Sequence, residues 1–430
     1  METVSALVPG TAVLMMPLLS APAWFFVIIA VFLIIRFLQC FSRCEVPKTY
    51  ISSSKDDQMA NVVHAIPMLR EIYRAPRLWG RNGHLQTGFY GVLGHALLRR
   101  QFNNRHAVKL ADGTTVSFDV FEPECDHPSG RDYTLALTPG IANSSESNYI
   151  RTCVHFAQEN GYRCVVLNHL GALKDMELTS PRIFGYGCTD ELSAMMHRLC
   201  ELYPETRFVC VGFSMGANIT TQFLIKTDRE CRDRIVAGLS VCQGYDARKS
   251  IEIYHEWEGG RRAYNYIITE NVKRLLRRNY EKAVLPWVRR GIVPIDKLWA
   301  ATSIFYIDEY YNRRVFGYDT VQEYYDAVSS INVLSQLEVP MAFLNALDDP
   351  LIPPSLWMPA KELIQDKRDT CFILTKHGGH LGFLEGHSLA PSSITWLDRF
   401  IVQYADAVIK QYDEPNRCAQ TQSSPSDTNN

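Results

Sequence analysis

The chain has 430 residues, of which 47% are hydrophobic and 21% are charged, and this is enough apolar material to bury a full core. A formal net charge of -2 supplies no basic excess to neutralise phosphates, so no nucleic-acid partner is predicted. The twelve cysteines form no C-x-x-C pair and no Cys/His cluster at metal-ligand spacing, so neither a zinc site nor a disulfide framework is expected, and no cofactor.

The N-terminal segment carries no charge between Glu2 and Arg36, and "AWFFVIIAVFLII" is its most apolar part, extended upstream by Leu14 to Leu19. Crossing a hydrocarbon core of about 30 Å takes ~20 residues. Basic residues follow the apolar run instead of preceding it, and no clear small-x-small cleavage site comes after it. The sequence therefore predicts a retained membrane anchor over residues 1–41, not a cleaved signal peptide.

The sequence gives two opposite indications of how this anchor is oriented in the membrane. Arg36, Arg43, Lys48 and Lys55 follow the apolar run, and the positive-inside rule then favours a cytoplasmic body. The sequon "NSS" makes Asn143 a candidate for glycosylation, which has meaning only on the external or lumenal side. A second sequon, "NIT" at Asn218, falls in a predicted helix.

After a connector and N-terminal extension over residues 42–115, strand-like and helix-like segments alternate. Strands are predicted at 116–122, 133–140, 162–168, 207–212, 237–242, 341–346 and 370–375, and helices at 148–160, 188–203 and from about Ile394. This order predicts an α/β fold over residues 116–410, with a mostly parallel central sheet and helices on both faces. Residues 245–335 break the alternation as an insertion, and residues 411–430 have the composition of a disordered tail.

The stretch "VGFSMGAN" places Gly212, Ser214 and Gly216 in a G-x-S-x-G motif between a strand and a helix. In a nucleophile elbow the glycines remove side chains that would block the tight turn, and the serine Oγ is exposed above the sheet. The helix that follows points its N-terminus at the reacting carbon. Ser214 is therefore the predicted nucleophile.

An acid and a base follow in the order that this elbow requires, in "NALDDP" and then "HGGHLGF", each just after a predicted strand. Asp349 is preferred to Asp348 as the acid because it lies further past its strand, directly before a proline. Asp348 is expected to bind the loop backbone. His380 is preferred to His377 as the base because two glycines give its loop the freedom to reach the elbow.

An oxyanion hole needs two backbone N–H groups. The residue after the nucleophile, Met215, supplies one of them, and the other comes from the loop "TPGIAN" after the early strand. Either Gly140 or Ile141 fits the second position.

Seven stretches carry a family resemblance in combination: "LWGRNGHLQT", "TPGIANSSESNYIR", "VLNHLGA", "TSPRIFGYGCTDEL", "VGFSMGAN", "NALDDP" and "HGGHLGF". From about residue 65 to residue 410 the chain resembles the membrane-anchored α/β-hydrolase-domain-containing family. The resemblance implies an α/β-hydrolase fold with Ser214, Asp349 and His380 as the charge-relay set. It also implies a monoacylglycerol lipase activity that responds to steroid binding. The implied topology is that of a type II protein of the plasma membrane or endoplasmic reticulum, with its body outside.

The insertion would then be a lid over the active site. Between Trp257 and Arg314 it holds twelve Lys/Arg and six Asp/Glu, interleaved with aromatic residues: Trp257, Tyr264, Tyr266, Trp287, Trp299 and Phe305. This composition suits contact with anionic lipid headgroups, and an ordinary solvated helical face explains it equally well. Another motif, His127-x4-Asp132, matches an acyltransferase pattern but lies in a polar turn away from the elbow, so a catalytic role is not expected.

Three functional classes are compatible with these residues. A serine ester hydrolase acting on lipid esters at a membrane is the leading prediction, because the anchor delivers the site to amphiphiles and the triad transfers an acyl group to water. An acyltransferase would use the same acyl-enzyme and exclude water. A lipid or steroid receptor on a hydrolase fold is disfavoured by the complete Ser, Asp and His set.

Overall fold

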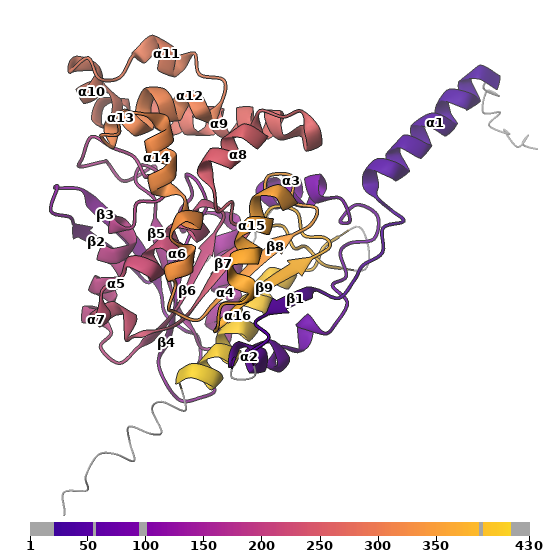
Figure 1. Ribbon diagram of the computed structural model, residues 1–430, viewed down its shortest axis with the longest axis horizontal. Helices are drawn as coiled ribbons and strands as arrows, with labels where there is room; N and C mark the ends of the chain where they lie inside the picture. Colours follow the sequence, from indigo (N-terminus) through magenta and orange to yellow (C-terminus); the bar gives the residue numbers. More distant parts are fainter. Residues whose placement is uncertain (1–20, 55–56, 94–100, 387–389, 414–430) are drawn as a thin grey trace, which may run out of the picture.

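The computed structural model describes residues 21–54, 57–93, 101–386 and 390–413. Helix α1 (Ala21–Leu38) projects from the body (Figure 1), and its large apolar side chains, including Phe25, Phe26 and Ile28, are exposed. Over the described ranges, no helix combines the length and the apolar character that a membrane span requires. The upstream part of the predicted anchor, residues 1–20, lies outside the described residues.

The body is built on one sheet of nine strands in the spatial order β1-β9-β8-β7-β6-β4-β5-β3-β2. The strands are β1 (Lys48–Ile51), β2 (Asn104–Lys109), β3 (Thr115–Phe121), β4 (Tyr133–Thr138), β5 (Arg163–Asn168), β6 (Arg207–Phe213), β7 (Ile235–Val241), β8 (Met341–Ala346) and β9 (Thr370–Thr375). Strands β4 to β9 pair in parallel, whereas β1, β2 and β3 pair antiparallel at the two edges. The sheet is therefore the mixed sheet of an α/β-hydrolase fold.

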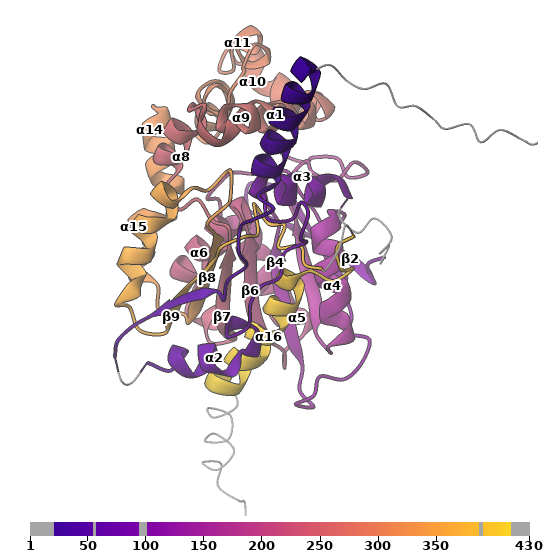
Figure 2. The same ribbon diagram turned by 90° about the vertical axis from the view of Figure 1, so that its right-hand side faces the viewer.

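The central strands are buried on both faces, as expected of parallel strands covered by helices. One face packs on α4 (Asn148–Glu159) and α16 (Trp396–Val408), and the other on α5 (Asp190–Leu202), α6 (Met215–Lys226) and α15 (Pro354–Gln365). Figure 2 shows these layers from the side. The short helix α7 (Arg229–Arg232) connects α6 to β7.

Between β7 and β8 the chain forms the insertion, a group of helices, most of them short, above the carboxyl ends of the strands (Figure 1). Its members are α8 (Ala247–Tyr254), η2 (Glu258–Gly260), α9 (Arg261–Arg278), η3 (Tyr280–Val284), α10 (Leu285–Arg289), α11 (Ile295–Trp299), α12 (Ile304–Ile307), η4 (Asp308–Asn312), α13 (Arg313–Val315), α14 (Val321–Val328), η5 (Ser330–Asn332) and η6 (Leu334–Gln336). Most of these helices pack in one hydrophobic cluster together with Leu170, Leu178, Ile183 and Phe184 from the segment between β5 and α5, so the insertion is packed onto the body.

The N-terminal extension is more ordered than its composition suggests. It contributes α2 (Met59–Ala65), η1 (Pro67–Leu69) and α3 (Gly83–Leu93), together with the edge strands β1 and β2, where no strand is predicted from sequence. Both edge strands are half exposed and read "KTYI" and "NRHAVK", so they lack the apolar run that marks a central strand. At the other end, residues 411–413 of the predicted tail belong to the helical segment η7 (Ile409–Asp413), and the rest of that tail lies outside the described residues.

Candidate active site

Ser214 occupies the turn between β6 and α6 with a strained backbone, at φ +54° and ψ -117°. A Cβ atom added at Gly216 would lie 2.1 Å from the carbonyl oxygen of Thr138, and one added at Gly212 would lie 2.5 Å from Cα of Ala217. Both neighbours are backbone atoms and cannot move aside. Only glycine fits these two positions, and their packing against β4 and α6 holds the serine in its unusual conformation.

Three side chains from three loops meet at this turn. The Nε2 atom of His380 lies 2.8 Å from Oγ of Ser214, and its Nδ1 atom lies 2.8 Å from Oδ2 of Asp349. The side chain of Asp349 is fully buried, and its other oxygen accepts hydrogen bonds from the amides of Leu351 at 2.8 Å and Ile352 at 3.0 Å. With Nδ1–H donating to this fixed carboxylate, Nε2 is free to accept the serine proton.

The neighbouring Asp348 and His377 have different partners. One oxygen of Asp348 accepts a hydrogen bond from the amide of Gly379 at 2.8 Å, and the other lies 3.6 Å from Nδ1 of His377. On its far side His377 contacts the hydroxyl of Ser42 at 3.2 Å. Burial raises the pKa of the Asp348 carboxyl. This pair fixes the loop that carries His380, and neither side chain reaches Ser214.

Two residues of α3 that sequence reasoning missed also support the histidine loop. The amide of His380 donates to Oγ1 of Thr87 at 2.9 Å, and Thr87 donates in turn to the carbonyl of Gly83 at 2.7 Å. The buried amide group of Gln86 accepts from the amide of Leu384 at 2.8 Å and donates to the carbonyl of Gly80 at 2.7 Å. Both residues lie in the stretch "NGHLQT", whose only signal was its part in the family resemblance.

The loop after β4 runs directly beside Ser214. The amide of Gly140 donates to the hydroxyl of Tyr149 at 2.6 Å. Gly140, Ile141 and Met215 all line the same cavity as Ser214. Of the two predicted alternatives in this loop, the amide of Ile141 is therefore the better oxyanion donor, because that of Gly140 is engaged.

A cavity of about 330 Å³ opens at Ser214 and His380. Its wall is mainly apolar and aromatic and combines residues of the sheet loops with residues of the insertion, among them Tyr245, Ile251, Tyr254, Ile268, Ile304 and Val328. A space of this size and polarity suits the acyl chain of an ester or another apolar ligand.

The structure argues against the predicted glycosylation of Asn143. This residue lines the cavity with Ser214, and its Oδ1 atom accepts a hydrogen bond from Oγ of Ser147 at 3.0 Å. Its Nδ2 atom, which would carry the glycan, faces Gly140. A glycan would have to fill the substrate space, a consequence that the sequon alone does not reveal. Asn218 is equally engaged, because its Nδ2 atom donates to the carbonyls of Tyr186 and Val328.

Most of the aromatic residues interleaved with basic ones in the insertion have a packing role. Tyr264, Trp287, Trp299 and Phe305 are partly buried against hydrophobic clusters. Trp257 and Tyr266 are exposed, at 74% and 51%, and the guanidinium group of Arg262 lies 5.0 Å from the Trp257 ring centroid. The surface available to a membrane is therefore narrower than the composition suggests.

His127 and Asp132 lie at the amino end of β4, at the opposite edge of the sheet from Ser214. The ring of His127 is buried between Tyr133 and Tyr162, and Asp132 pairs with Arg163 at 2.6 Å. These contacts account for both residues structurally, as the sequence analysis expects.

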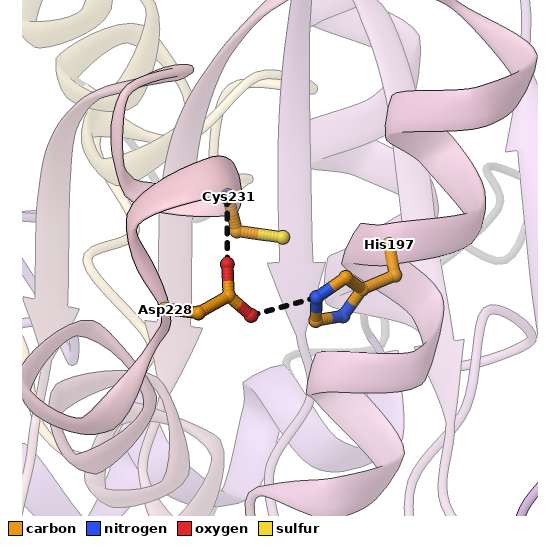
Figure 3. A group of neighbouring side chains, drawn as sticks. All are labelled: His197, Asp228 and Cys231. Carbon is orange, nitrogen blue, oxygen red and sulfur yellow. Dashed lines mark hydrogen bonds and ion pairs between the residues drawn. The ribbon is translucent and has the colours of Figure 1, made fainter.

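Among the described residues, the structure brings together two clusters of possible metal ligands that the sequence spacing did not indicate. One is Cys242 with Asp349 and His380 of the active site, and the other is His197, Asp228 and Cys231 (Figure 3). Nε2 of His197 lies 2.7 Å from Asp228, whose other oxygen accepts from the amide of Cys231 at 3.0 Å and caps α7. An ion pair and a helix cap thus account for the carboxylate. The cluster lies at the amino ends of β6 and β7, away from the cavity.

A Ser–His–Asp arrangement at the carboxyl edge of such a sheet defines an ester-hydrolysing enzyme of the α/β-hydrolase class. Residues 133–387 match the family model for the alpha/beta hydrolase fold, and the chain belongs to this family. It is 38% identical to "Monoacylglycerol lipase ABHD2" of Mus musculus over 395 residues, which cover 91% of this chain and 92% of that protein.

Two further relatives extend the comparison. "Abhydrolase domain-containing protein 2" of Drosophila melanogaster is 41% identical over 348 residues, covering 81% of this chain and 87% of that protein. "Phospholipase ABHD3" of Homo sapiens is 30% identical over 351 residues, covering 80% and 81%. The resemblance inferred from the seven motifs is thereby confirmed.

Proposed function

We propose that the chain is a membrane-anchored monoacylglycerol lipase that uses Ser214 as nucleophile, His380 as base and Asp349 as orienting acid. The observation that carries this proposal is the pair of 2.8 Å contacts that join the three side chains at the mouth of an apolar cavity. Relatives named monoacylglycerol lipase support the choice of substrate class.

The geometry accounts for each step of ester hydrolysis. Oγ of Ser214 attacks the ester carbonyl carbon while Nε2 of His380 takes the hydroxyl proton. The amides of Met215 and Ile141 stabilise the developing oxyanion. His380 then gives its proton to the glycerol oxygen, the C–O bond of the ester breaks, and glycerol leaves an acyl-enzyme. Water attacks that acyl group with His380 again as base, which releases the fatty acid and restores Ser214.

The membrane part of the proposal rests on α1 and on its attachment to the site. Asn82 donates to the carbonyl of Phe37 at the end of α1, and Arg81 donates to that of Cys40 at 2.7 Å. Both donors precede α3, which supports the His380 loop. Exposed apolar side chains of α1 would enter the bilayer and hold the cavity close to its surface.

The proposed orientation is type II, with the body on the external or lumenal side at the plasma membrane or endoplasmic reticulum. The family resemblance supports this side, while the basic residues that follow the anchor favour the opposite one. Protease protection on intact vesicles distinguishes them. For type II, added protease should cleave the body in right-side-out plasma-membrane vesicles, and should leave it intact in sealed endoplasmic-reticulum vesicles until they are permeabilised. The opposite results would contradict type II.

A response to steroids belongs to the same proposal. The apolar cavity of about 330 Å³ is a space in which a rigid apolar ligand would compete with the acyl chain. A steroid bound there raises the apparent KM for a monoacylglycerol and leaves kcat unchanged. A steroid that changes kcat alone would bind elsewhere.

The test of the activity is direct. The purified full chain should release free fatty acid from a monoacylglycerol, and a fluorophosphonate probe should label it at Ser214. Labelling without fatty acid release, together with transfer of the acyl group to an added alcohol, would identify an acyltransferase. Absence of labelling in a folded sample would indicate a lipid or steroid receptor.

A further inference from the structure

The wall of the cavity contains one acidic side chain among the described residues that line it, Asp308. This residue begins the π-helical segment η4 of the insertion and is fully buried. π-helical turns occur frequently at functional sites, where they widen the helix and place side chains off its regular faces. An acid at this place needs an explanation, because a buried carboxylate is costly in an apolar cavity.

The contacts of Asp308 come from neutral donors. Oδ1 accepts a hydrogen bond from Nδ2 of Asn312 at 2.6 Å, and Oδ2 accepts one from the hydroxyl of Tyr325 at 2.8 Å. Within the described part of the chain, no lysine, arginine or histidine pairs with it, and burial raises the pKa of the Asp308 carboxyl to about 7. The group is therefore not half of a buried ion pair that merely fastens the insertion.

The hydrogen-bonding capacity of this cluster is not exhausted. A carboxylate has about four acceptor positions, and the two hydrogen bonds above use two of them. The hydroxyl of Tyr186 lies beside the same carboxyl and interacts with it and with Asn312, although its buried oxygen has no hydrogen bond of good geometry. Asp308, Tyr186 and Tyr325 all line the cavity. A ligand in the cavity therefore meets a carboxyl with acceptor capacity to spare and a tyrosine hydroxyl whose contact with that carboxyl is loose.

We propose that Asp308, Tyr186 and Tyr325 form a polar subsite that binds a hydroxyl group of the ester substrate and so selects hydroxyl-bearing lipids. The inference rests on the proposed lipase function and adds a specificity determinant to it. A hydroxyl suits the cluster because it donates to the carboxyl and accepts from the Tyr186 hydroxyl at the same time. The hydroxyl can come from the glycerol head or from a hydroxylated acyl chain.

The experiment compares three esters of one chain length: a monoacylglycerol, the propyl ester of the same acid, and the propyl ester of its terminally hydroxylated acid. The readout is the ratio of kcat/KM for each hydroxyl-bearing ester to that of the plain propyl ester. Asp308→Asn should lower this ratio about tenfold, the value of one hydrogen bond to a buried partner, and mainly through KM. The ester whose ratio falls identifies the source of the hydroxyl.

Two further variants keep the test decisive. Tyr325→Phe removes one neutral donor without changing charge, and it should lower the same ratio by a smaller factor, about threefold. Asp398→Asn is the matched control, because Asp398 is also buried with a pKa raised to about 7 but is absent from the wall of this cavity. Its ratio should equal that of the wild type. An equal loss on all three esters in Asp308→Asn would show a purely structural role and overturn the proposal.

A binding arm separates this inference from the lipase proposal. In Ser214→Ala, a monoalkylglycerol ether should bind more tightly than the alkyl propyl ether, and Asp308→Asn in the same background should remove the difference. If the wild type hydrolyses none of the esters while this difference holds, the lipase assignment fails and the subsite stands. Equal affinities of the two ethers, together with equal affinities of the plain and the terminally hydroxylated alkyl propyl ethers, would overturn the subsite alone.

Discussion

The elbow region and the insertion meet at one cavity, but they are held in place by different forces. Around Ser214 the conformation depends on backbone contacts, such as the carbonyl of Thr138 that excludes any side chain at Gly216. In the insertion, around Asp308, it depends on side-chain packing in a hydrophobic cluster and on hydrogen bonds between side chains in short and partly π-helical segments. The first arrangement tolerates almost no change, whereas the second can vary residue by residue. Bond-making geometry therefore lies in the rigid region, and substrate selection lies in the adaptable one.

Removing the nucleophile gives the largest effect expected in the elbow region. Ser214→Ala should reduce kcat on a monoacylglycerol by ~10⁵-fold or more, since no other group replaces the attacking oxygen. The thermal midpoint should stay close to that of the wild type, because one oxygen is lost from a cavity wall. Turnover above a tenth of the wild-type value would rule out Ser214 as the nucleophile.

The next largest effect is expected at the two adjacent acids, where replacing Asp349 should lower kcat far more than replacing Asp348. Asp349→Asn should lower kcat by roughly 10³ to 10⁴, because the imidazole of His380 loses its orienting partner. Asp348→Asn weakens the contacts to Gly379 and His377, neither of which touches Ser214, and should cost about tenfold or less. Steady-state kinetics of the two purified variants provides the measurement. Equal losses would mean that the two carboxyl groups share the role.

Glycine substitutions allow the two regions to be compared by their effect on the free energy of unfolding, not on the catalytic rate. Gly216→Ala brings a methyl group against the Thr138 carbonyl and should cost several kcal/mol or prevent folding. Gly291→Ala in the insertion has open space around it and only a left-handed φ of +70°, so about 1 kcal/mol is expected. Chemical denaturation of both variants gives the comparison. Similar costs would remove the distinction between a rigid and an adaptable region.

Acidity should affect the insertion through Asp308. Its folded pKa of about 7 lies above the ordinary value of 3.8, so between about pH 4 and pH 7 the folded state holds a proton that the unfolded state has lost. Stability from this group is present at low pH and is lost as pH rises to 7. Asp308→Asn removes that loss. The difference in thermal unfolding midpoint, variant minus wild type, should therefore be larger at pH 8 than at pH 5 by at least about 2 °C. A constant difference across that range would contradict the assignment.

The central strands and the three catalytic candidates were within reach of sequence reasoning because their signals are local. An apolar run such as "RFVCVG" predicts a strand without reference to the rest of the chain. Ser214, Asp349 and His380 each follow such a run. Thr87 and Asp308 give no comparable signal, since their partners lie 293 and 17 residues away and only folding brings them together. Short polar edge strands such as β1 depend on pairing with a distant strand for the same reason.

The smallest expected effect concerns the exposed aromatic residues of the insertion, where the composition left two readings open. If Trp257 and Tyr266 contact lipid, replacing both by serine should weaken binding of the full chain to anionic vesicles by severalfold, because each aromatic ring loses favourable contact with the interface. The matched control is Leu363→Ser, since Leu363 is likewise exposed, at 49%, but lies on α15 and not on the insertion. Vesicle flotation measures both. Because α1 supplies a separate apolar surface, every variant should still bind vesicles. The test is therefore whether the double variant at Trp257 and Tyr266 binds more weakly than Leu363→Ser. Equal binding of the two would exclude Trp257 and Tyr266 from the membrane contact.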